Sequence, residues 1–261
     1  MTVNCDLPYD RIEEFHIGHY HYGDVQMITN VIYNLAVRDK FVGKVHFANN
    51  NIGQHIMTIF DYSGYIELVS HVDKAKHGLQ FNRILNLTGN LARHLWCSIN
   101  VGYSSFFFEP LKSFVLPKTR IPMLEKNNLT CFQFDNRSAG GSKVGLNFDE
   151  MCRAVSLFGD EKSIAVGGHG SRHYFPERLT HYASLYDQAK FLLRAKSFFG
   201  VDSGMSHLAG TLGVDGDIIM QATCPIHFDS LKFGYNFMYP SFRIHRRDSI
   251  SAMPKKIIKL A

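Results

Sequence analysis

Apolar residues follow two spacings that alternate along the chain. Short apolar runs, of the kind that form buried strands, alternate with stretches in which apolar residues recur every three or four positions, as on one face of a helix. In the first part of the chain the pattern predicts strands over residues 13–17, 43–48 and 65–70 and helices over residues 25–35 and 52–62. Strands that alternate with helices in this way are typical of an α/β fold with a parallel sheet.

The pattern is interrupted between Pro110 and Lys126. Three prolines and four basic residues fall within this stretch, which is the composition of a linker. A second alternation follows, with strands over 129–134, 162–167, 197–201 and 217–221 and helices over 148–158, 182–194 and 205–212. We therefore predict two α/β domains, residues 1–122 and 123–261. The second ends in a basic tail around a candidate last helix, with Arg243, His245, Arg246 and Arg247.

The composition excludes some classes of protein and leaves others open. The 261 residues are 45% hydrophobic and 20% charged, as in ordinary globular proteins. The formal net charge of +5 is compatible with an anionic ligand, a nucleic acid or an acidic membrane surface and selects none of them. The five cysteines are scattered without a Cys-x-x-Cys pair, so neither a zinc ribbon nor a disulfide framework is indicated. The N-terminal residues do not have the pattern of a signal peptide, and no apolar run approaches the length of ~20 residues that a membrane span needs. We therefore expect a cytoplasmic protein without an integral membrane segment.

The most informative segment follows the third predicted strand of the second domain. This apolar strand leads into Asp202-Ser203-Gly204 and then into a helix, so polar groups lie where a parallel strand ends at its carboxyl edge. Open α/β sheets bind ligands at that edge. The N–H groups at the start of the helix suit a phosphate, and Ser206 and His207 add side-chain donors. An equally simple interpretation is that Asp202 and Ser203 only cap the helix.

Residues 201–209, Val-Asp-Ser-Gly-Met-Ser-His-Leu-Ala, resemble the donor-site signature of the heptosyltransferase family of glycosyltransferases. Residues 23–25, Gly-Asp-Val, are similar to the family's Gly-Asp-Val, and residues 221–225 resemble its Gly-x-Thr-x-Pro loop, with Ala222 where glycine is usual. Lys143 stands where the family has a phosphate-binding lysine, although a Val-Gly pair follows it in place of the family's Trp-Pro. The resemblance spans about residues 15–228.

The resemblance implies a GT-B fold, in which two Rossmann-like domains with parallel sheets face a central cleft. It also implies an inverting, metal-independent transfer of a sugar from a nucleotide-diphosphate sugar, as co-substrate, to an acceptor hydroxyl, without a cofactor. In this reading Asp24 is the catalytic base. Arg137 or Arg153 is an alternative to Lys143 as the source of positive charge. The residues expected to bind the donor are Lys143, Arg137, Gly168, Asp202, Ser203, Gly204, Ser206 and His207.

Simpler structural roles remain open for several of these residues. Asp24 would also stabilise the dipole of the helix that it begins, and Lys143 would also fit a solvated loop. Gly168 lies in a glycine-rich turn that either contacts the nucleotide or only reverses the chain.

A cluster of histidines near the N-terminus raises the question of a zinc site. His16, His19 and His21 fall close together, but their spacing and the lack of an identified further ligand argue against zinc. We expect His19, His21 and Tyr22 to face the acceptor or to form a structural polar patch.

The sequence leaves more than one class of acceptor open. Some bacteriophage GT-B enzymes glycosylate hydroxymethylated pyrimidines in DNA, and a short, basic, aromatic chain with a small first domain resembles them. The leading expectation is therefore a modified base in DNA, flipped towards Asp24. The phosphates would lie on Lys112, Lys118 or Arg120, or on the tail that carries Arg246 and Arg247. One alternative is heptosyltransferase-like transfer to lipopolysaccharide or another saccharide, and a second is a non-catalytic nucleotide-sugar binder.

Overall fold

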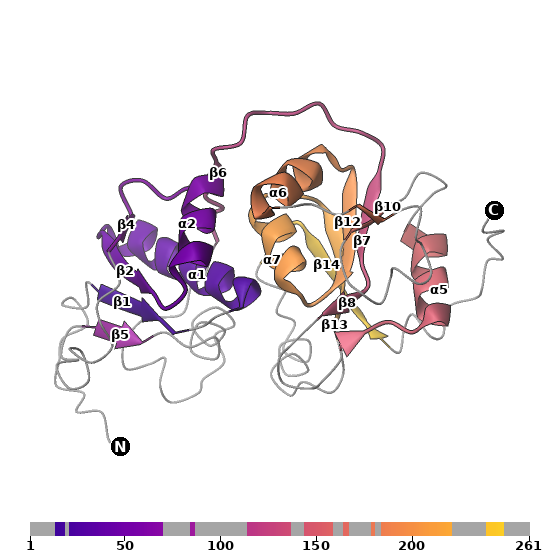
Figure 1. Cartoon of the computed structure of the whole chain (residues 1–261), viewed down its shortest axis with the longest axis horizontal. Coiled ribbons are helices and arrows are strands. Elements are labelled where there is room, and N and C mark those ends of the chain that lie inside the picture. Colours follow the sequence, from indigo (N-terminus) through magenta and orange to yellow (C-terminus); the bar gives the residue numbers. More distant parts are fainter. Residues whose placement is uncertain are drawn as a thin grey trace, which may run out of the picture. The chain divides into compact units, whose positions relative to one another are not determined.

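The computed structural model of the chain shows two units, Met1–Arg120 and Ile121–Ala261, each built around its own parallel sheet (Figure 1). Within the described part of the chain, no helix is long and apolar enough to cross a membrane. The structure describes residues 14–18, 21–69, 84–86, 114–136, 144–158, 164–166, 179–180, 184–220 and 239–247.

The main sheet of the first unit has four parallel strands in the order β4-β2-β1-β5. The strands are β1 (Glu14–Ile17), β2 (Gly43–Phe47), β4 (Ile66–Leu68) and β5 (Ile84–Asn86). The helix α1 (Tyr22–Asp39) follows β1, and α2 (Asn50–Ile59) follows β2. The short strand β3 (Phe60–Asp61) pairs with β6 (Lys118–Thr119) at the end of the unit. The first strand of the chain, β1, lies inside the main sheet between β2 and β5. The chain therefore adds β2 and β4 on one side of β1 and then β5 on the other side.

The helix α1 is buried over most of its length and carries buried polar as well as apolar side chains. The Gln26 amide donates to the Tyr62 hydroxyl oxygen (2.9 Å), and that hydroxyl donates to Asn30 Oδ1 (2.8 Å). The backbone N–H of Val115 donates to Asn34 Oδ1 (2.6 Å), and Asn34 Nδ2 donates back to the Val115 carbonyl (3.1 Å). Because buried polar groups are costly without partners, the first pair of bonds holds Tyr62 against α1 and the second holds the segment around Val115 against it.

The sheet of the second unit has six parallel strands in the order β11-β10-β7-β12-β13-β14. In chain order this is 3-2-1-4-5-6, the order of doubly wound dinucleotide-binding sheets. The strands are β7 (Thr130–Gln133), β10 (Ile164–Val166), β11 (Leu179–Thr180), β12 (Ser197–Val201), β13 (Gly216–Met220) and β14 (Phe242–Arg246). The helices are α5 (Phe148–Phe158), α6 (Leu185–Arg194) and α7 (Gly204–Thr211). The strands β8 (Asp135–Asn136) and β9 (Val144–Gly145) form an antiparallel pair before α5.

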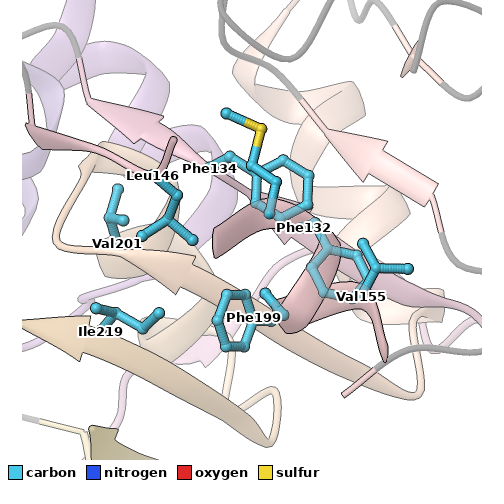
Figure 2. Close-up of a cluster of buried hydrophobic side chains, with 9 residues drawn as sticks. Phe132, Phe134, Leu146, Val155, Phe199, Val201 and Ile219 are labelled. Atoms are coloured by element: carbon cyan, nitrogen blue, oxygen red, sulfur yellow. The ribbon is translucent and has the colours of Figure 1, made fainter. Parts of the chain in front are cut away.

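Alternate residues of the central strands form one apolar core with α5 (Figure 2). The rings of Phe132 and Phe199 lie 5.5 Å apart between centroids, and Phe158 of α5 stacks on Phe199 at 4.7 Å. The helices α6 and α7 lie on the opposite side of this sheet from α5 (Figure 1). The buried residues of the core cluster are Phe132, Phe134, Leu146, Met151, Ala154, Val155, Phe199, Val201 and Ile219.

The predicted α/β fold with parallel sheets is confirmed, but the region assigned to a basic tail contains a strand that was not predicted. Residues 242–246 form β14, which pairs in parallel with β13. The buried Asp217 of β13 accepts from Arg243 Nε (2.8 Å) and Nη2 (2.6 Å) and lies 2.7 Å from His245 Nε2. Burial tends to raise the pKa of Asp217, but the bonds and charges of His245 and Arg243 hold this pKa below its usual value. The negative charge of Asp217 thus compensates the basic side chains of β14, which explains how this basic segment can pair with β13 in the sheet.

Candidate functional site

The loop after β12 lies at the point where the second sheet changes its winding direction. The strands β7 and β12 are neighbours, yet the chain proceeds from β7 outwards to β10 and β11 before it returns to β12. The loops that leave two such strands diverge to opposite sides of the sheet and open a crevice between them, which is where doubly wound sheets bind ligands. Asp202 and Ser203, which lead into Gly204 at the start of α7, form one of these two loops.

Ser203 ends this loop as the N-cap of α7. It accepts from two N–H groups of the first helical turn but not from those of Gly204 and Met205. Its Oγ accepts from the Ser206 N–H (3.3 Å), and its carbonyl accepts from the His207 N–H (3.2 Å). The first residues of an α-helix have no intrahelical acceptor for their N–H groups. Within the described ranges no acceptor is recorded for the N–H groups of Gly204 and Met205, and both residues are partly exposed. Together with the helix dipole, these two groups suit an anion such as a phosphate.

The Ser206 side chain is fully buried and bonds inward. Its hydroxyl donates to the Val201 carbonyl and lies 3.2 Å from Ser203 Oγ. These bonds hold the turn between β12 and α7 in one shape. The geometry therefore supports a local structural role for the Ser206 hydroxyl, and its predicted contact with the donor stays a prediction.

His207 is also buried, and both of its ring nitrogens face protein groups. Nδ1 lies 3.0 Å from the Tyr239 hydroxyl, and Nε2 lies 3.5 Å from Asp202 Oδ1. The exposed fraction is 5% for the His207 side chain and 18% for the Asp202 side chain, so Asp202 is the more accessible of the two. The structure brings the predicted residues Asp202 and His207 together, with the imidazole behind the carboxylate.

The start of α5 is held by an ion pair that the sequence analysis did not identify. The Asn147 N–H donates to Glu150 Oε2 (2.8 Å), and the Glu150 N–H donates to Asn147 Oδ1 (2.9 Å), which is a capping box. Arg247 donates to both oxygens of Glu150 (2.8 and 2.7 Å) and to the Gly145 carbonyl (2.9 Å). The Asn-x-x-Glu spacing was a detectable signal for the cap, but nothing local marks Arg247 as its partner. Arg247 is thus an anchored side chain, in contrast to its expected place in a free tail.

In the first unit, Asp24 lies in the first turn of α1, after the first strand of its sheet. The Asp24 residue is partly exposed, whereas its neighbours Gly23 and Val25 are buried. His21 is the exposed N-cap residue of α1 and makes no side-chain cap bond. The Tyr22 hydroxyl donates to Gln26 Oε1 (2.9 Å), so its proton is used within the helix.

Four other predicted site residues lie outside the described part of the chain. These are Lys143, Arg137, Gly168 and His19. The Gly-x-Thr-x-Pro-like loop over 221–225 lies outside it as well. Across the residues that the structure does describe, no group of three or more His, Cys, Asp or Glu side chains is placed to hold a metal ion.

Comparisons with known proteins give likenesses at the level of structure alone. No protein-family profile matches the sequence, and no curated protein matches it. The chain is similar in structure to a glycosyl transferase of family 9 from Veillonella parvula, with a TM-score of 0.53 and 12% identity over 94% of this chain and 90% of that one. It is also similar to E. coli ADP-heptose lps heptosyltransferase II, with a TM-score of 0.54 and 10% identity over 92% and 94%.

A third similar structure is TibC from enterotoxigenic E. coli, described as an iron-containing dodecameric glycosyltransferase. The TM-score is 0.57 and the identity 16% over 89% of this chain, which spans 62% of the length of TibC. TibC is also known in complex with ADP-D-β-D-heptose. At these identities the likenesses establish the fold, which is the predicted α/β fold of GT-B glycosyltransferases.

Proposed function

We propose that the chain is a glycosyltransferase that moves a sugar from a nucleotide-diphosphate sugar to a hydroxyl of a saccharide acceptor. The observation that carries the proposal is the position of Asp202-Ser203-Gly204 at the switch point of a 3-2-1-4-5-6 sheet, where Gly204 begins α7. Sheets of this order bind nucleotides at that point, and the fold is that of known glycosyltransferases.

The reaction requires a group that accepts the proton of the attacking hydroxyl. The acceptor oxygen forms a bond to the anomeric carbon while the bond from that carbon to the diphosphate oxygen breaks, which inverts the configuration. The electron pair of the broken bond leaves with the diphosphate, and the hydroxyl proton passes to the base. We assign the base to Asp24, because it is a partly exposed carboxylate in the first turn after the first strand of its sheet.

The leaving diphosphate needs donors that are in place before the bond breaks. The N–H groups of Gly204 and Met205, with the dipole of α7, supply hydrogen bonds without a cost of reorganisation. Lys143, or Arg137 in its place, remains the proposed source of positive charge. Asp202 is a poor partner for a diphosphate because both are negative, and we therefore assign its carboxylate to a hydroxyl of the transferred sugar.

The acceptor is better matched by a saccharide than by DNA. Two of the similar structures are described as heptosyltransferases. One is E. coli ADP-heptose lps heptosyltransferase II, and the other is TibC, which is described in complex with ADP-D-β-D-heptose. In addition, Arg247 is paired with Glu150 and Arg120 with Asp61 (3.0 Å), so two of the cations expected on DNA phosphates are held by carboxylates. We propose an ADP-activated heptose or a related sugar as the donor.

A direct test combines nucleotide binding with turnover. Calorimetry with ADP and ADP-D-β-D-heptose measures donor binding, and mass spectrometry detects transfer to lipopolysaccharide core and, separately, to hydroxymethylated DNA. We expect donor binding and transfer to the saccharide only. Transfer to the DNA alone would restore the DNA acceptor, and binding without transfer to either would favour the non-catalytic binder.

The substitution Asp24→Asn tests the base. Because a general base contributes about 100- to 10,000-fold to the rate, we expect turnover to fall by about that factor while ADP affinity stays within about twofold. The matched control is Asp39→Asn at the other end of α1, where the carboxylate pairs with the adjacent Arg38. Turnover that survives in Asp24→Asn would remove Asp24 as the base.

A further inference from the structure

Tyr239 lies beside the candidate donor site although it is 32 positions beyond His207 in the sequence. It precedes β14, and its carbonyl accepts from the Phe242 N–H (3.0 Å) in the turn that starts this strand. The Tyr239 side chain is fully buried, and its ring packs edge-on against the His207 ring with 5.8 Å between centroids. A tyrosine hydroxyl buried in this way requires a partner, and here the partners belong to α7.

The hydrogen bonds around the Tyr239 hydroxyl determine where its proton goes. The Thr211 hydroxyl donates to the His207 carbonyl at 2.7 Å. In the longer contact between the two hydroxyls, at 3.5 Å, Thr211 Oγ1 is the donor atom and the Tyr239 oxygen the acceptor, so the acceptor left for the Tyr239 proton is His207 Nδ1 at 3.0 Å. A neutral imidazole that accepts at Nδ1 carries its own proton on Nε2, and Nε2 is the nitrogen that faces Asp202.

We propose that Tyr239 is a positioning residue of the donor site. Its hydroxyl fixes the His207 tautomer with the proton on Nε2, so that this N–H faces the Asp202 carboxylate 3.5 Å away and holds it electrostatically in the orientation that receives the sugar. The inference rests on the proposed function for the role of Asp202, whereas the tautomer of His207 follows from the protein alone. It also accounts for a buried histidine at a position where a diphosphate contact was expected.

The first test is the nitrogen spectrum of the His207 side chain, which needs no substrate. In the wild-type protein near neutral pH we expect Nδ1 at the unprotonated end of the ¹⁵N shift range and Nε2 at the protonated end. The His207→Gln variant identifies the signals among those of the fourteen histidines. In Tyr239→Phe, which keeps the packed ring, the two shifts should move towards each other as both tautomers become populated. A protonated Nδ1 in the neutral wild-type ring would overturn the proposal, and so would an unchanged spectrum in Tyr239→Phe.

The second test separates the sugar from the nucleotide. Loss of the hydrogen bond between Tyr239 and His207 in Tyr239→Phe should weaken ADP-D-β-D-heptose binding about three- to tenfold, whereas ADP, which lacks the sugar, should bind as before. The effect should vanish when Tyr239→Phe is combined with His207→Gln, because Tyr239 acts through that ring. Tyr33→Phe, which also removes the hydroxyl of a buried tyrosine but in the first unit, is the matched control and should leave both affinities unchanged.

The outcomes distinguish this inference from the proposed function. If the wild-type protein binds neither nucleotide, the proposed function fails, and the nitrogen spectrum alone decides whether Tyr239 orients His207. If both nucleotides bind but Tyr239→Phe weakens them equally or leaves ADP-D-β-D-heptose unaffected, the positioning role is wrong while the proposed function stands.

Discussion

At the scale of single residues, a missing side chain makes room for Tyr239. Gly210 lies inside α7, where glycine costs about 1 kcal/mol relative to alanine. A Cβ built at this position would meet Cγ and Cδ2 of the Tyr239 ring at 2.3 Å, far inside van der Waals contact. Glycine at position 210 therefore lowers the helix propensity of α7 but allows the Tyr239 ring to pack closely against the helix beside His207.

The substitution Gly210→Ala tests this packing. Helix propensity alone would stabilise the variant by about 1 kcal/mol, but overpacking of a filled core costs about 1–3 kcal/mol. We expect a net loss in the free energy of unfolding, measured in urea, together with the same movement of the His207 nitrogen shifts as in Tyr239→Phe. An increase in stability with an unchanged nitrogen spectrum would show that the ring does not lie against position 210.

At the scale of elements, β14 shows how one carboxylate allows charged residues to form a strand. The sequence of β14, Phe-Arg-Ile-His-Arg, alternates apolar and basic residues, but its positive charge is typical of a solvated tail. The partner Asp217 is an acidic residue in the otherwise apolar β13, about 26 positions earlier. Neither segment alone indicates the pairing, so the strand was missed.

The ion pair between these strands predicts a pH-dependent stability. Because the pKa of Asp217 is lowered in the folded state, its contribution is present above the unfolded pKa of about 3.9 and is lost as the pH falls through the lower folded value. Arg243 is 65% exposed and regains water when its partner is removed, so Asp217→Asn should cost only about 1–2 kcal/mol at pH 7.

Urea unfolding across pH gives the measurement. The difference between wild-type and Asp217→Asn proteins should shrink below about pH 4, where the wild-type carboxylate becomes protonated. The control is Asp61→Asn, which removes a similar but exposed pair with Arg120 and should have a smaller effect. A difference that persists at acid pH would mean that the charge of Asp217 is not what stabilises the strand.

Elements with strong periodicity were predictable, whereas contacts distant in sequence were not. The helix expected over 148–158 is α5 with the same ends, and the helix expected over 205–212 is α7 shifted by one residue. The loop Asp202-Ser203-Gly204 was found because a strand and a helix flank it. The pairings of Tyr239 with His207 and of Arg247 with Glu150 could not be predicted, because the partners lie 32 and 97 positions apart and no local pattern records them.

At the scale of the whole molecule, the proposed base and the proposed donor site belong to different units. The segment between the units is attached at both ends: the Arg120 N–H donates to the Ile59 carbonyl (2.8 Å), and the Asn127 N–H donates to the Arg194 carbonyl (2.7 Å). Between these bonds, Met123 is fully exposed and Glu125 is exposed. An exposed connection with anchored ends is where proteolysis divides two domains that fold by themselves.

Limited cleavage after Glu125 with a glutamate-specific protease should therefore separate two folded fragments. We expect the fragment that begins at Lys126 to keep ADP affinity within about twofold, since all the proposed diphosphate contacts lie in it, and we expect transfer to be lost once the fragments are separated. Calorimetry, and the mass-spectrometric transfer assay on each purified fragment, measure the two effects. The control is Glu125→Gln, which removes the cleavage site and should retain transfer after the same treatment. Transfer by the second fragment alone would exclude Asp24 as the base, because the base would then have to lie within the unit that binds the donor.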